Sequence, residues 1–489
     1  MPITQRTWWP RGLRQVGVVV AVSAAVVAFA AYRVWQAFAG PPAIWNDSLD
    51  YPVSKVWAGS RPPLVPALLG FAGTATRFVV IEVVVAIAAW TLLALVVARL
   101  MPLRWRALAA VLVLAFGCTT AVVRWDRSIL SESLAMSVLA LLLAAVLAAG
   151  HGSLSWWNVV ALVAAGALFA SVKDAHVWMV WLLAIVVAID TVVRSRGVKG
   201  VVAALGLALC AGAFLGGSMS AHRADEPIAH AYFVRVFPYP DRVQWFADHG
   251  MPDADQVNAY ARATVTPRGE APVVGIDSHD GLVQPLVRWL ARDGERVYLQ
   301  WLAQHPWIAL TEPFVTPERA FNFAQGNIGM YSAPGRTELG PFDRLIFPPA
   351  VLMVAIAAFA LTGGLRSDLR RQGWWWLLVA FGGIGVVHML LAWHADGMET
   401  TRHAVVANAQ ARLCVVILAA AALAELSSPP ARVSSAEPVG TLSHGFLRRH
   451  AGTGTKRDRR EELARPEGPP RPGDLEGASV RSGSRKWGD

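Results

Sequence analysis

Long apolar segments separated by short polar ones dominate the chain from about residue 16 to residue 424. A helix of roughly 17 to 25 apolar residues crosses a hydrocarbon core of about 30 Å, and segments of about this length recur along the chain. They cover residues 16–38, 78–98, 106–123, 133–149, 156–171, 175–193, 200–219, 346–364, 374–393 and 404–424. Because the alternating pattern of a membrane barrel is lacking, the segments predict an all-α polytopic membrane protein with about ten transmembrane helices.

The longest polar region between two predicted spans, residues 221–344, separates the seventh span from the eighth. From Leu282 to Gln304 apolar residues return every three or four positions, which predicts an amphipathic helix ending before Pro306. Its predicted apolar face is Leu286, Trp289, Leu290, Val297, Leu299, Trp301 and Leu302. The rest of this region reads as loops and short elements.

The spans divide the chain into four parts. An N-terminal transmembrane module with the first outer loop covers residues 1–220, and an extracytoplasmic loop region covers 221–344. C-terminal transmembrane helices cover 345–425. Residues 426–489 are rich in Pro, Gly, Ser, Arg and Glu, which predicts a disordered, basic tail. This tail either is solvated or lies against anionic lipid head groups.

The formal net charge of +10 follows the predicted membrane topology and does not indicate nucleic-acid binding. With ten spans, four basic clusters fall on one side of the membrane, the side that retains Arg and Lys. They are Arg6/Arg11/Arg14, Arg99/Arg104/Arg106, Arg194/Arg196/Lys199 and Arg366/Arg370/Arg371. The expected location is therefore the cytoplasmic (plasma) membrane, with both termini cytoplasmic and residues 221–344 outside. The turn 151–157 has no Arg or Lys, so the helix count between residues 133 and 193 stays open.

Three cysteines, Cys118, Cys210 and Cys414, all lie in predicted spans. The predicted outer loops therefore have no cysteine for a disulfide or a metal site. The first span has a basic start and small residues near Ala39, as a signal peptide does. Its apolar run is long for a signal peptide, and we interpret it as an uncleaved span.

The first outer loop carries the candidate chemistry. Asp47, Asp50 and Tyr51 follow the first span in the stretch WNDSLDY, and one helical turn separates Asp47 from Tyr51. Taken alone, this stretch fits a solvated loop that caps a helix, because Asn, Asp and Ser are good cap residues. The chain then returns to the membrane through an extended segment, Gly59–Pro66, that contains Arg61 and three prolines.

Other polar residues lie at the predicted outer ends of spans. Glu132 starts an apolar helix, where it either serves the helix dipole or has a function. Arg124 and Arg127 either pair with Asp126 or hold phosphate oxygens. Arg402 and His403 begin the last span and are further phosphate-binding candidates, with Glu399 as a competing partner of Arg402.

Ionisable residues close to or inside spans need partners, because charges in lipid are costly. We expect Glu82 to pair with Arg77, and Lys173 with Asp174, although Lys173 can also meet a substrate phosphate. His388 and His394 are six positions apart and do not share a helix face, so they do not predict a metal site. A divalent cation on oxygen ligands such as Asp50 and Glu132 stays an open alternative.

Several of these motifs occur in one order and on one predicted side. An acidic residue is followed four positions later by Tyr and then by an RPP-x-x-P return to the membrane; Ser131–Leu134, Gln304–Pro306 and Asp396–His403 come later. In this order they resemble the GT-C-fold glycosyltransferases that use polyprenyl-phosphate sugars, including bacterial relatives of protein mannosyltransferases. The resemblance covers residues 10–425, although each motif is short.

The resemblance implies transfer of a sugar from a polyprenyl-phosphate carrier to an acceptor hydroxyl on the outer face of the membrane. Asp47 would be the general base, with Asp50 as the second candidate. Tyr51, Arg61, Arg124, Glu132, Arg402 and His403 would bind substrate or the lipid phosphate. The acceptor would be a glycan, a lipid or a protein, and no nucleotide-binding motif is needed or present.

Two other functional classes fit a protein with about ten spans. A polyprenyl-linked glycan polymerase or ligase would carry catalytic Arg and His residues in the region 221–344. A lipid or glycan transporter would show interrupted helices and two related halves, whereas the spans read as continuous.

Overall fold

The computed structural model describes about two thirds of the chain in detail. The described residues are 11–45, 48, 62–219, 228, 231–232, 234–252, 284–315, 350–395 and 403–427. The predicted disordered tail therefore lies almost entirely outside the described residues.

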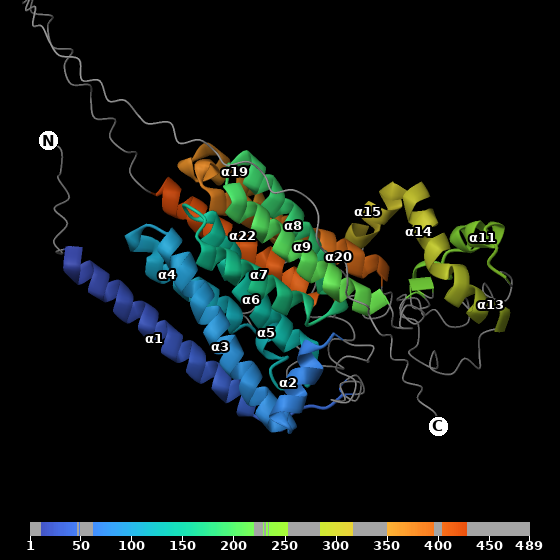
Figure 1. Ribbon diagram of the computed structural model, residues 1–489, viewed down its shortest axis with the longest axis horizontal. Helices are drawn as coiled ribbons and strands as arrows, with labels where there is room; N and C mark the ends of the chain where they lie inside the picture. The colour runs from blue at the N-terminus through green and yellow to red at the C-terminus, as the bar shows by residue number, and fades with distance from the viewer. Residues whose placement is uncertain are drawn as a thin grey trace, which may run out of the picture. The chain divides into compact units, whose positions relative to one another are not determined.

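Long apolar helices make up the membrane part of the protein, which is an all-α polytopic membrane protein (Figure 1). Seven helices in the described part are long and apolar enough to cross a membrane. They are α1 (Arg11–Phe38), α3 (Ala75–Leu100), α6 (Ser131–Gly150), α8 (Asp174–Val193), α9 (Gly197–Met219), α20 (Gly373–Ala395) and α22 (Val405–Leu426). Two shorter apolar helices, α7 (Trp156–Ala170) and α19 (Ala350–Arg366), coincide with two further predicted spans. The predicted total of about ten spans and their orientation stay predictions.

The predicted continuous span 106–123 is wrong in one respect, because the helix is interrupted. Helix α4 (Arg106–Gly117) ends at Gly117, and a single turn, α5 (Thr120–Val123), follows. Thr119 is extended, and its hydroxyl donates to the carbonyl of Phe116 at 2.7 Å. Irregular backbone at membrane depth is tolerated where it is buried in protein and its polar groups are satisfied, and the interruption is buried.

Helix α6 is the central element of the bundle, because nearly all its residues are buried, the polar Ser131, Glu132, Ser133 and Ser137 included. It packs against α3, α7, α20 and α22. Helix α1 lies at the periphery of the bundle, and most of its side chains are exposed. Its main contacts are with α3, α4 and the short segments on either side of α4. A helix that is apolar on its exposed side is suited to face lipid.

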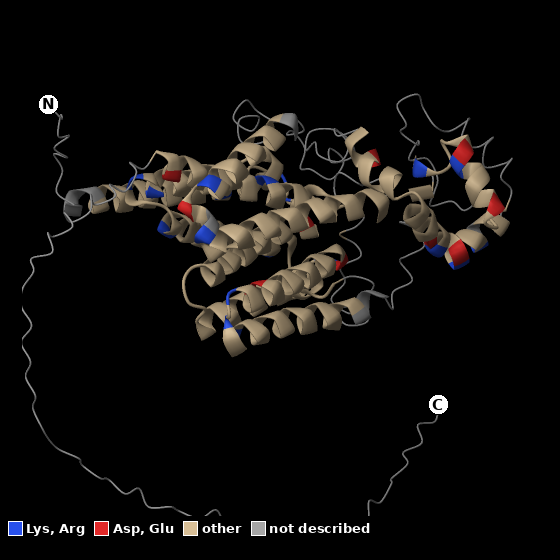
Figure 2. Ribbon diagram, turned by 90° about the horizontal axis from the view of Figure 1, so that it is seen from above, with Lys and Arg blue, Asp and Glu red and all other residues tan. Residues whose placement is uncertain are grey.

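Basic residues of the bundle gather toward one end (Figure 2). The connection from α3 to α4 meets the end of α22 there, since Arg104 and Trp105 donate to the hydroxyl of Ser427 at 3.2 and 3.1 Å. Arg194 of the α8–α9 turn reaches the carbonyl of Arg371, just before α20, at 3.4 Å. Basic residues from three parts of the chain that are far apart in sequence therefore lie at this end of the bundle.

A second hydrophobic cluster lies outside the bundle, in the region between α9 and α19. Its helices are α11 (Pro240–Asp248), α13 (Gln284–Trp289), a π-helical turn (Leu290–Gly294), α14 (Glu295–Gln304) and α15 (Pro306–Val315). The amphipathic helix expected up to Gln304 is confirmed, and Leu286, Trp289, Leu290, Val297 and Trp301 of its face are buried. The expectation for Leu299 is wrong, because this residue lies two positions from both Val297 and Trp301 in α14 and points away from the face that they share. Its side chain is 55% exposed.

Aromatic and polar contacts join this module to the end of α20. The guanidinium of Arg235 lies 3.7 Å from the centre of the Trp393 ring. His394 bridges two helices of the module, with Nδ1 3.2 Å from the hydroxyl of Tyr298 and Nε2 2.8 Å from the carbonyl oxygen of Ala309. A cation–π contact and a shared imidazole of this kind fix the module against the membrane helix.

Close packing between α6 and α20 generates a testable prediction. A Cβ atom on Gly150 would lie 2.5 Å from the Trp374 Cα atom, whereas one on Gly212 of α9 would meet nothing within 4 Å. We expect Gly150→Ala to lower the apparent melting temperature in detergent by several degrees, because backbone atoms must move apart. Gly212→Ala is the matched control in another membrane helix. Equal melting temperatures of the two variants would contradict the close approach of α6 and α20.

Candidate functional site

A buried ion pair joins α1 to the connection between α5 and α6. Nη2 of Arg33 lies 2.7 Å from Oδ1 of Asp126, and both side chains are 1% exposed. Nη1 of Arg33 donates to the carbonyl oxygen of Gly117 at 2.9 Å. The same guanidinium therefore provides a hydrogen bond to the backbone where α4 is interrupted. Ser133 at the start of α6 also donates to Asp126 Oδ1, at 3.0 Å.

Burial raises the pKa of Asp126 to about 6, while Arg33 and the hydrogen bond from Ser133 act in the opposite direction. The two contacts that hold the carboxyl group in place thus oppose the effect of its burial.

A second ion pair lies at the beginning of α6. Glu132 is fully buried, and its Oε1 is 3.1 Å from Nζ of Lys173, which precedes α8. The side chain of Lys173 is 17% exposed, in contrast with the buried Arg33. Carboxylates at the N-terminus of a helix are stabilised by the unpaired N–H groups and the helix dipole, and the buried start of α6 provides both.

Glu82 of α3 belongs to the same group of charges. It is 1% exposed and lies within electrostatic reach of Asp126, Arg33 and Glu132. Both oxygens of its carboxyl group are buried and have no hydrogen-bond partner among the described residues. Three carboxylates and two cations therefore lie around one end of α6, in an apolar bundle where such groups mark functional sites.

Histidines extend this charged group toward α20 and α22. The His176 ring, in the first turn of α8, stacks on Phe169 at 4.1 Å and lies 6.2 Å from the ring of His388 in α20. His176 is within electrostatic reach of both Lys173 and Glu132. His388 is within reach of Lys173 and of His403, which precedes α22.

The beginning of the first outer loop is held against the α5–α6 connection. Ala43 pairs with the strand-like segment around Ser128, with hydrogen bonds to Arg127 and Ile129 of 2.7 and 3.0 Å. Ser48, which lies between Asp47 and Asp50 in sequence, donates to the carbonyl oxygen of Ile129 at 2.7 Å and is buried. The described part of the loop therefore contacts the segment that carries Asp126 and leads to Glu132.

The segment that leaves this loop is also held near the charged group. After Arg61, helix α2 (Leu64–Ala72) begins, and the backbone N–H of Leu64 donates to the carbonyl of Ser171 at 3.1 Å. Ser171 is two residues before Lys173. Both described edges of the loop thus reach connections that carry buried charges.

Among the predicted site residues, Arg124, Glu132 and His403 lie in the described part of the chain. Asp47, Asp50, Tyr51, Arg61 and Arg402 lie outside the described residues. Arg124 is buried at the end of α5, and its Nε donates to the carbonyl of Thr120 at 3.3 Å. Its proposed role in phosphate binding therefore stays a prediction.

Two expected pairings, and one alternative that the sequence left open, are wrong. Asp126 pairs with Arg33 of α1 and not with Arg124 or Arg127. Lys173 pairs with Glu132 and not with Asp174.

Glu82 points to the charges at the start of α6, whereas its expected partner Arg77 lies in the exposed first turn of α3. For Asp126 and Lys173 a partner from a distant part of the chain replaces a sequence neighbour, because the helices bring it closer. The two carboxyl oxygens of Glu82 have no hydrogen-bond partner among the described residues. Arg33 did not enter the sequence interpretation, although an arginine inside an apolar span is itself a signal.

No group of three His, Cys, Asp or Glu side chains in the described residues is arranged to hold a metal ion. Cys118, Cys210 and Cys414 are free thiols. Asp50, one of the two oxygen ligands considered for a divalent cation, lies outside the described residues, so that alternative stays untested.

No protein-family model matches this chain, and no curated protein is significantly similar to it in sequence.

The Arg33–Asp126 pair generates a prediction on stability. Arg33→Met leaves Asp126 buried without its cation, which typically costs about 3–5 kcal/mol. We expect a large fall in the apparent melting temperature of Arg33→Met, and recovery of most of it in Arg33→Met/Asp126→Leu, where no charge is left unpaired. Melting curves of the purified variants in detergent measure both. A double variant as unstable as the sum of its single variants would contradict the pairing.

Proposed function

We propose that the protein is a membrane glycosyltransferase that moves a sugar from a polyprenyl-phosphate carrier to an acceptor hydroxyl at the outer face of the cytoplasmic membrane. The observation that carries the proposal is the group of buried charges of both signs around the start of α6. Ser48, which lies between the two candidate bases in sequence, and Leu64, which follows the loop, contact the connections that bear these charges.

The reaction needs one base and one cation at a position sheltered from bulk water. The acceptor oxygen attacks the anomeric carbon while the bond from that carbon to the lipid-phosphate oxygen breaks. The proton of the acceptor hydroxyl goes to a carboxylate, and the electron pair of the broken bond leaves with the phosphate. The ordered motifs of the first outer loop support Asp47 as this base, with Asp50 as the alternative.

The two ion pairs suit different roles in this reaction. Arg33 is buried and is held by both Asp126 and the Gly117 carbonyl, which supports a structural role. Lys173 is partly exposed, and its ammonium group lies beside Glu132. It can therefore contact a phosphate group while Glu132 holds it in place. Cations at such a position stabilise the charge that develops on a leaving phosphate.

The test is sugar transfer in vitro. Purified wild type, Asp47→Asn and Asp50→Asn are supplied with a panel of polyprenyl-phosphate sugars, including arabinose and mannose donors, and with candidate glycan, lipid and protein acceptors. We expect Asp47→Asn to lower transfer by about 100-fold or more, the usual contribution of a general base. Asp241→Asn is the control, because Asp241 is an exposed carboxylate of α11 in the extramembrane module.

Other outcomes would lead to other conclusions. Full transfer activity of Asp47→Asn, together with loss of transfer activity in Asp50→Asn, would identify Asp50 as the general base. Activity that survives both changes, but is lost when Arg and His residues of 221–344 are replaced, would indicate a polymerase or ligase. No transfer from any donor by the folded wild type would overturn the proposal.

A further inference from the structure

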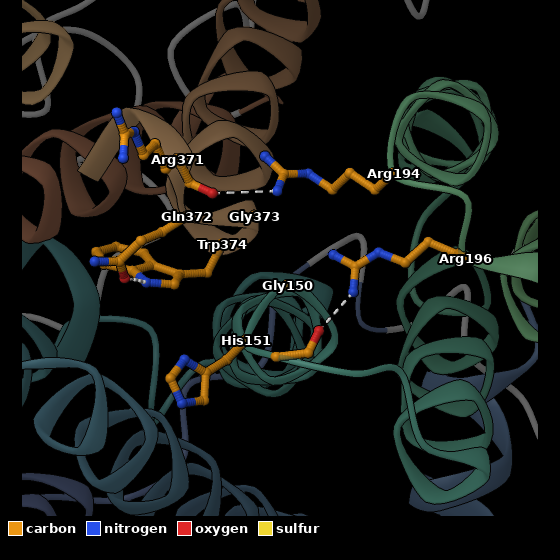
Figure 3. A pocket seen from close by; sticks show the side chains of 9 residues that line it. Gly150, His151, Arg194, Arg196, Arg371, Gln372, Gly373 and Trp374 are labelled. Atoms are coloured by element: carbon orange, nitrogen blue, oxygen red, sulfur yellow. Dashed lines mark hydrogen bonds between the residues drawn. The ribbon is translucent and has the colours of Figure 1, made fainter. Parts of the chain in front are cut away.

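A basic cavity lies at the other end of α6 from the buried carboxylates. Helix α6 has 20 residues, and at 1.5 Å per residue its two ends are about 30 Å apart. The cavity has a volume of about 420 Å³ and lies between the end of α6, the start of α20 and the α8–α9 turn (Figure 3). Its charged lining residues are Arg194, Arg196 and Arg371, and no carboxylate lines it among the described residues.

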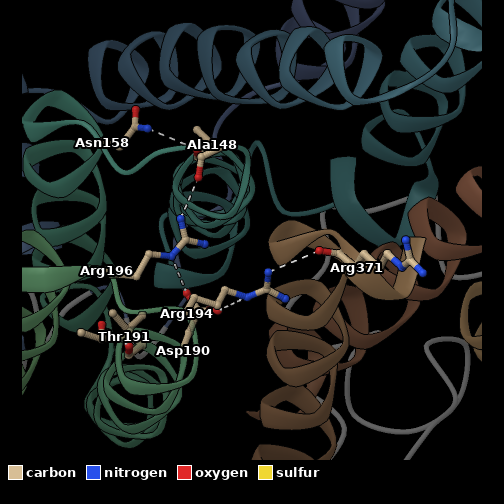
Figure 4. Close-up of polar contacts among 9 residues, drawn as sticks. Ala148, Asn158, Asp190, Thr191, Arg194, Arg196 and Arg371 are labelled. Atoms are coloured by element: carbon tan, nitrogen blue, oxygen red, sulfur yellow. Dashed lines mark hydrogen bonds and ion pairs between the residues drawn. The ribbon is translucent and has the colours of Figure 1, made fainter. Parts of the chain in front are cut away.

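Asp190 lies between Arg194 and Arg196 and orients both side chains (Figure 4). Its two oxygens lie 2.8 Å from Nε of Arg194 and 3.0 Å from Nε of Arg196. One Nη atom of Arg196 donates to the carbonyl of Gly152 at 2.8 Å, and one Nη atom of Arg194 reaches the carbonyl of Arg371 at 3.4 Å. Since a guanidinium has five N–H donors, each arginine keeps donors for a ligand, and one carboxylate offsets only one of their two charges.

The third arginine is held least by the protein. Arg371 is 75% exposed, and its carboxylate neighbour Asp368 lies 4.0 Å away and is 79% exposed. Such exposed pairs are weak. Its backbone carbonyl faces Arg194, whereas its guanidinium points away from the arginine pair (Figure 3). A change of rotamer of this exposed side chain would bring it to an anion bound to Arg194 and Arg196.

Glycine makes room for the guanidinium groups in the cavity. A Cβ atom on Gly373 would lie 2.8 Å from Nη2 of Arg196 and 2.7 Å from the carbonyl oxygen of Gly150. Helix α20 begins at Gly373, and no acidic residue is present in its first turn. The N–H groups of that turn add to the positive potential that the three arginines create.

Apolar surface beside Arg194 and Arg196 favours a lipid as the ligand over a free anion, because a lipid has acyl chains that can contact this surface. A neighbouring cavity of about 530 Å³ shares Arg194 and Arg196 and is also lined by Trp156, Val198 and Lys199. Trp156 is 51% exposed and Val198 is 71% exposed, as expected of residues that contact acyl chains and the interface. Arginines can hold the phosphate in a fork while the chains lie along this apolar surface.

We infer that this basic cavity binds the phosphate group of an anionic membrane phospholipid. The expected orientation puts it on the cytoplasmic side, where anionic lipids attract basic segments and occupy basic pockets between helices. The inference does not rest on the proposed transferase activity, because the cavity lies at the opposite end of α6.

The test measures lipid binding to the purified full-length protein by native mass spectrometry, with phosphatidylglycerol, cardiolipin and phosphatidylcholine as probes. We expect retained phosphatidylglycerol or cardiolipin and little phosphatidylcholine. Arg194→Gln/Arg371→Gln should weaken binding of the anionic lipids at least tenfold. Arg366→Gln is the matched control, because Arg366 is an exposed arginine near the same end of the bundle that does not line the cavity.

Competition with inorganic phosphate separates the two sources of a phosphate group. Displacement of phosphatidylglycerol by millimolar phosphate, with equal thermal protection by phosphate alone, would make this an inorganic-anion site and overturn the inference. An equal loss in Arg366→Gln, or equal retention of phosphatidylcholine, would also overturn it. Arg371→Gln alone repeats the test should the double variant melt below the wild type, because Arg371 is mostly exposed.

Discussion

The membrane bundle depends on the guanidinium of Arg33, which satisfies three separate requirements from one position. It neutralises Asp126 and donates a hydrogen bond to the carbonyl oxygen of Gly117. It also joins the otherwise exposed α1 to the bundle. A buried carboxylate or an unsatisfied carbonyl in a membrane bundle costs several kcal/mol. The interrupted α4–α5 segment, the position of Asp126 and the docking of α1 are therefore stabilised together.

Hydrophobic length predicted the helices well, because an apolar run in lipid has few alternatives to a helix. Each of the ten predicted segments coincides with a helix, and only the segment 106–123 is divided into two. Apolar length does not report the break after Gly117, since the residues on both sides are apolar. The break depends on a hydrogen bond from Arg33, which is 84 residues away in sequence.

The charged partners were harder to predict than the helices, and for a physical reason. Sequence suggested a neighbour, Asp174, for Lys173, but a charge in the bundle pairs with an opposite charge that the packed helices bring within about 4 Å. Glu132 is 41 residues from Lys173 and satisfies that condition. The sequence did locate Glu132 as a candidate, because it is a charged residue at the predicted outer end of an apolar span, whereas its cation required the fold.

The exposure of α1 has a consequence for how the protein assembles during synthesis. Arg33 has no carboxylate partner until a further 93 residues have been made, so the first helix enters the bilayer before its docking site exists. Its arginine lies near the end of the helix, where a long side chain can extend to the interface and limit the cost of its charge. The ion pair between Arg33 and Asp126 therefore forms only after α3, α4 and α5 have been made.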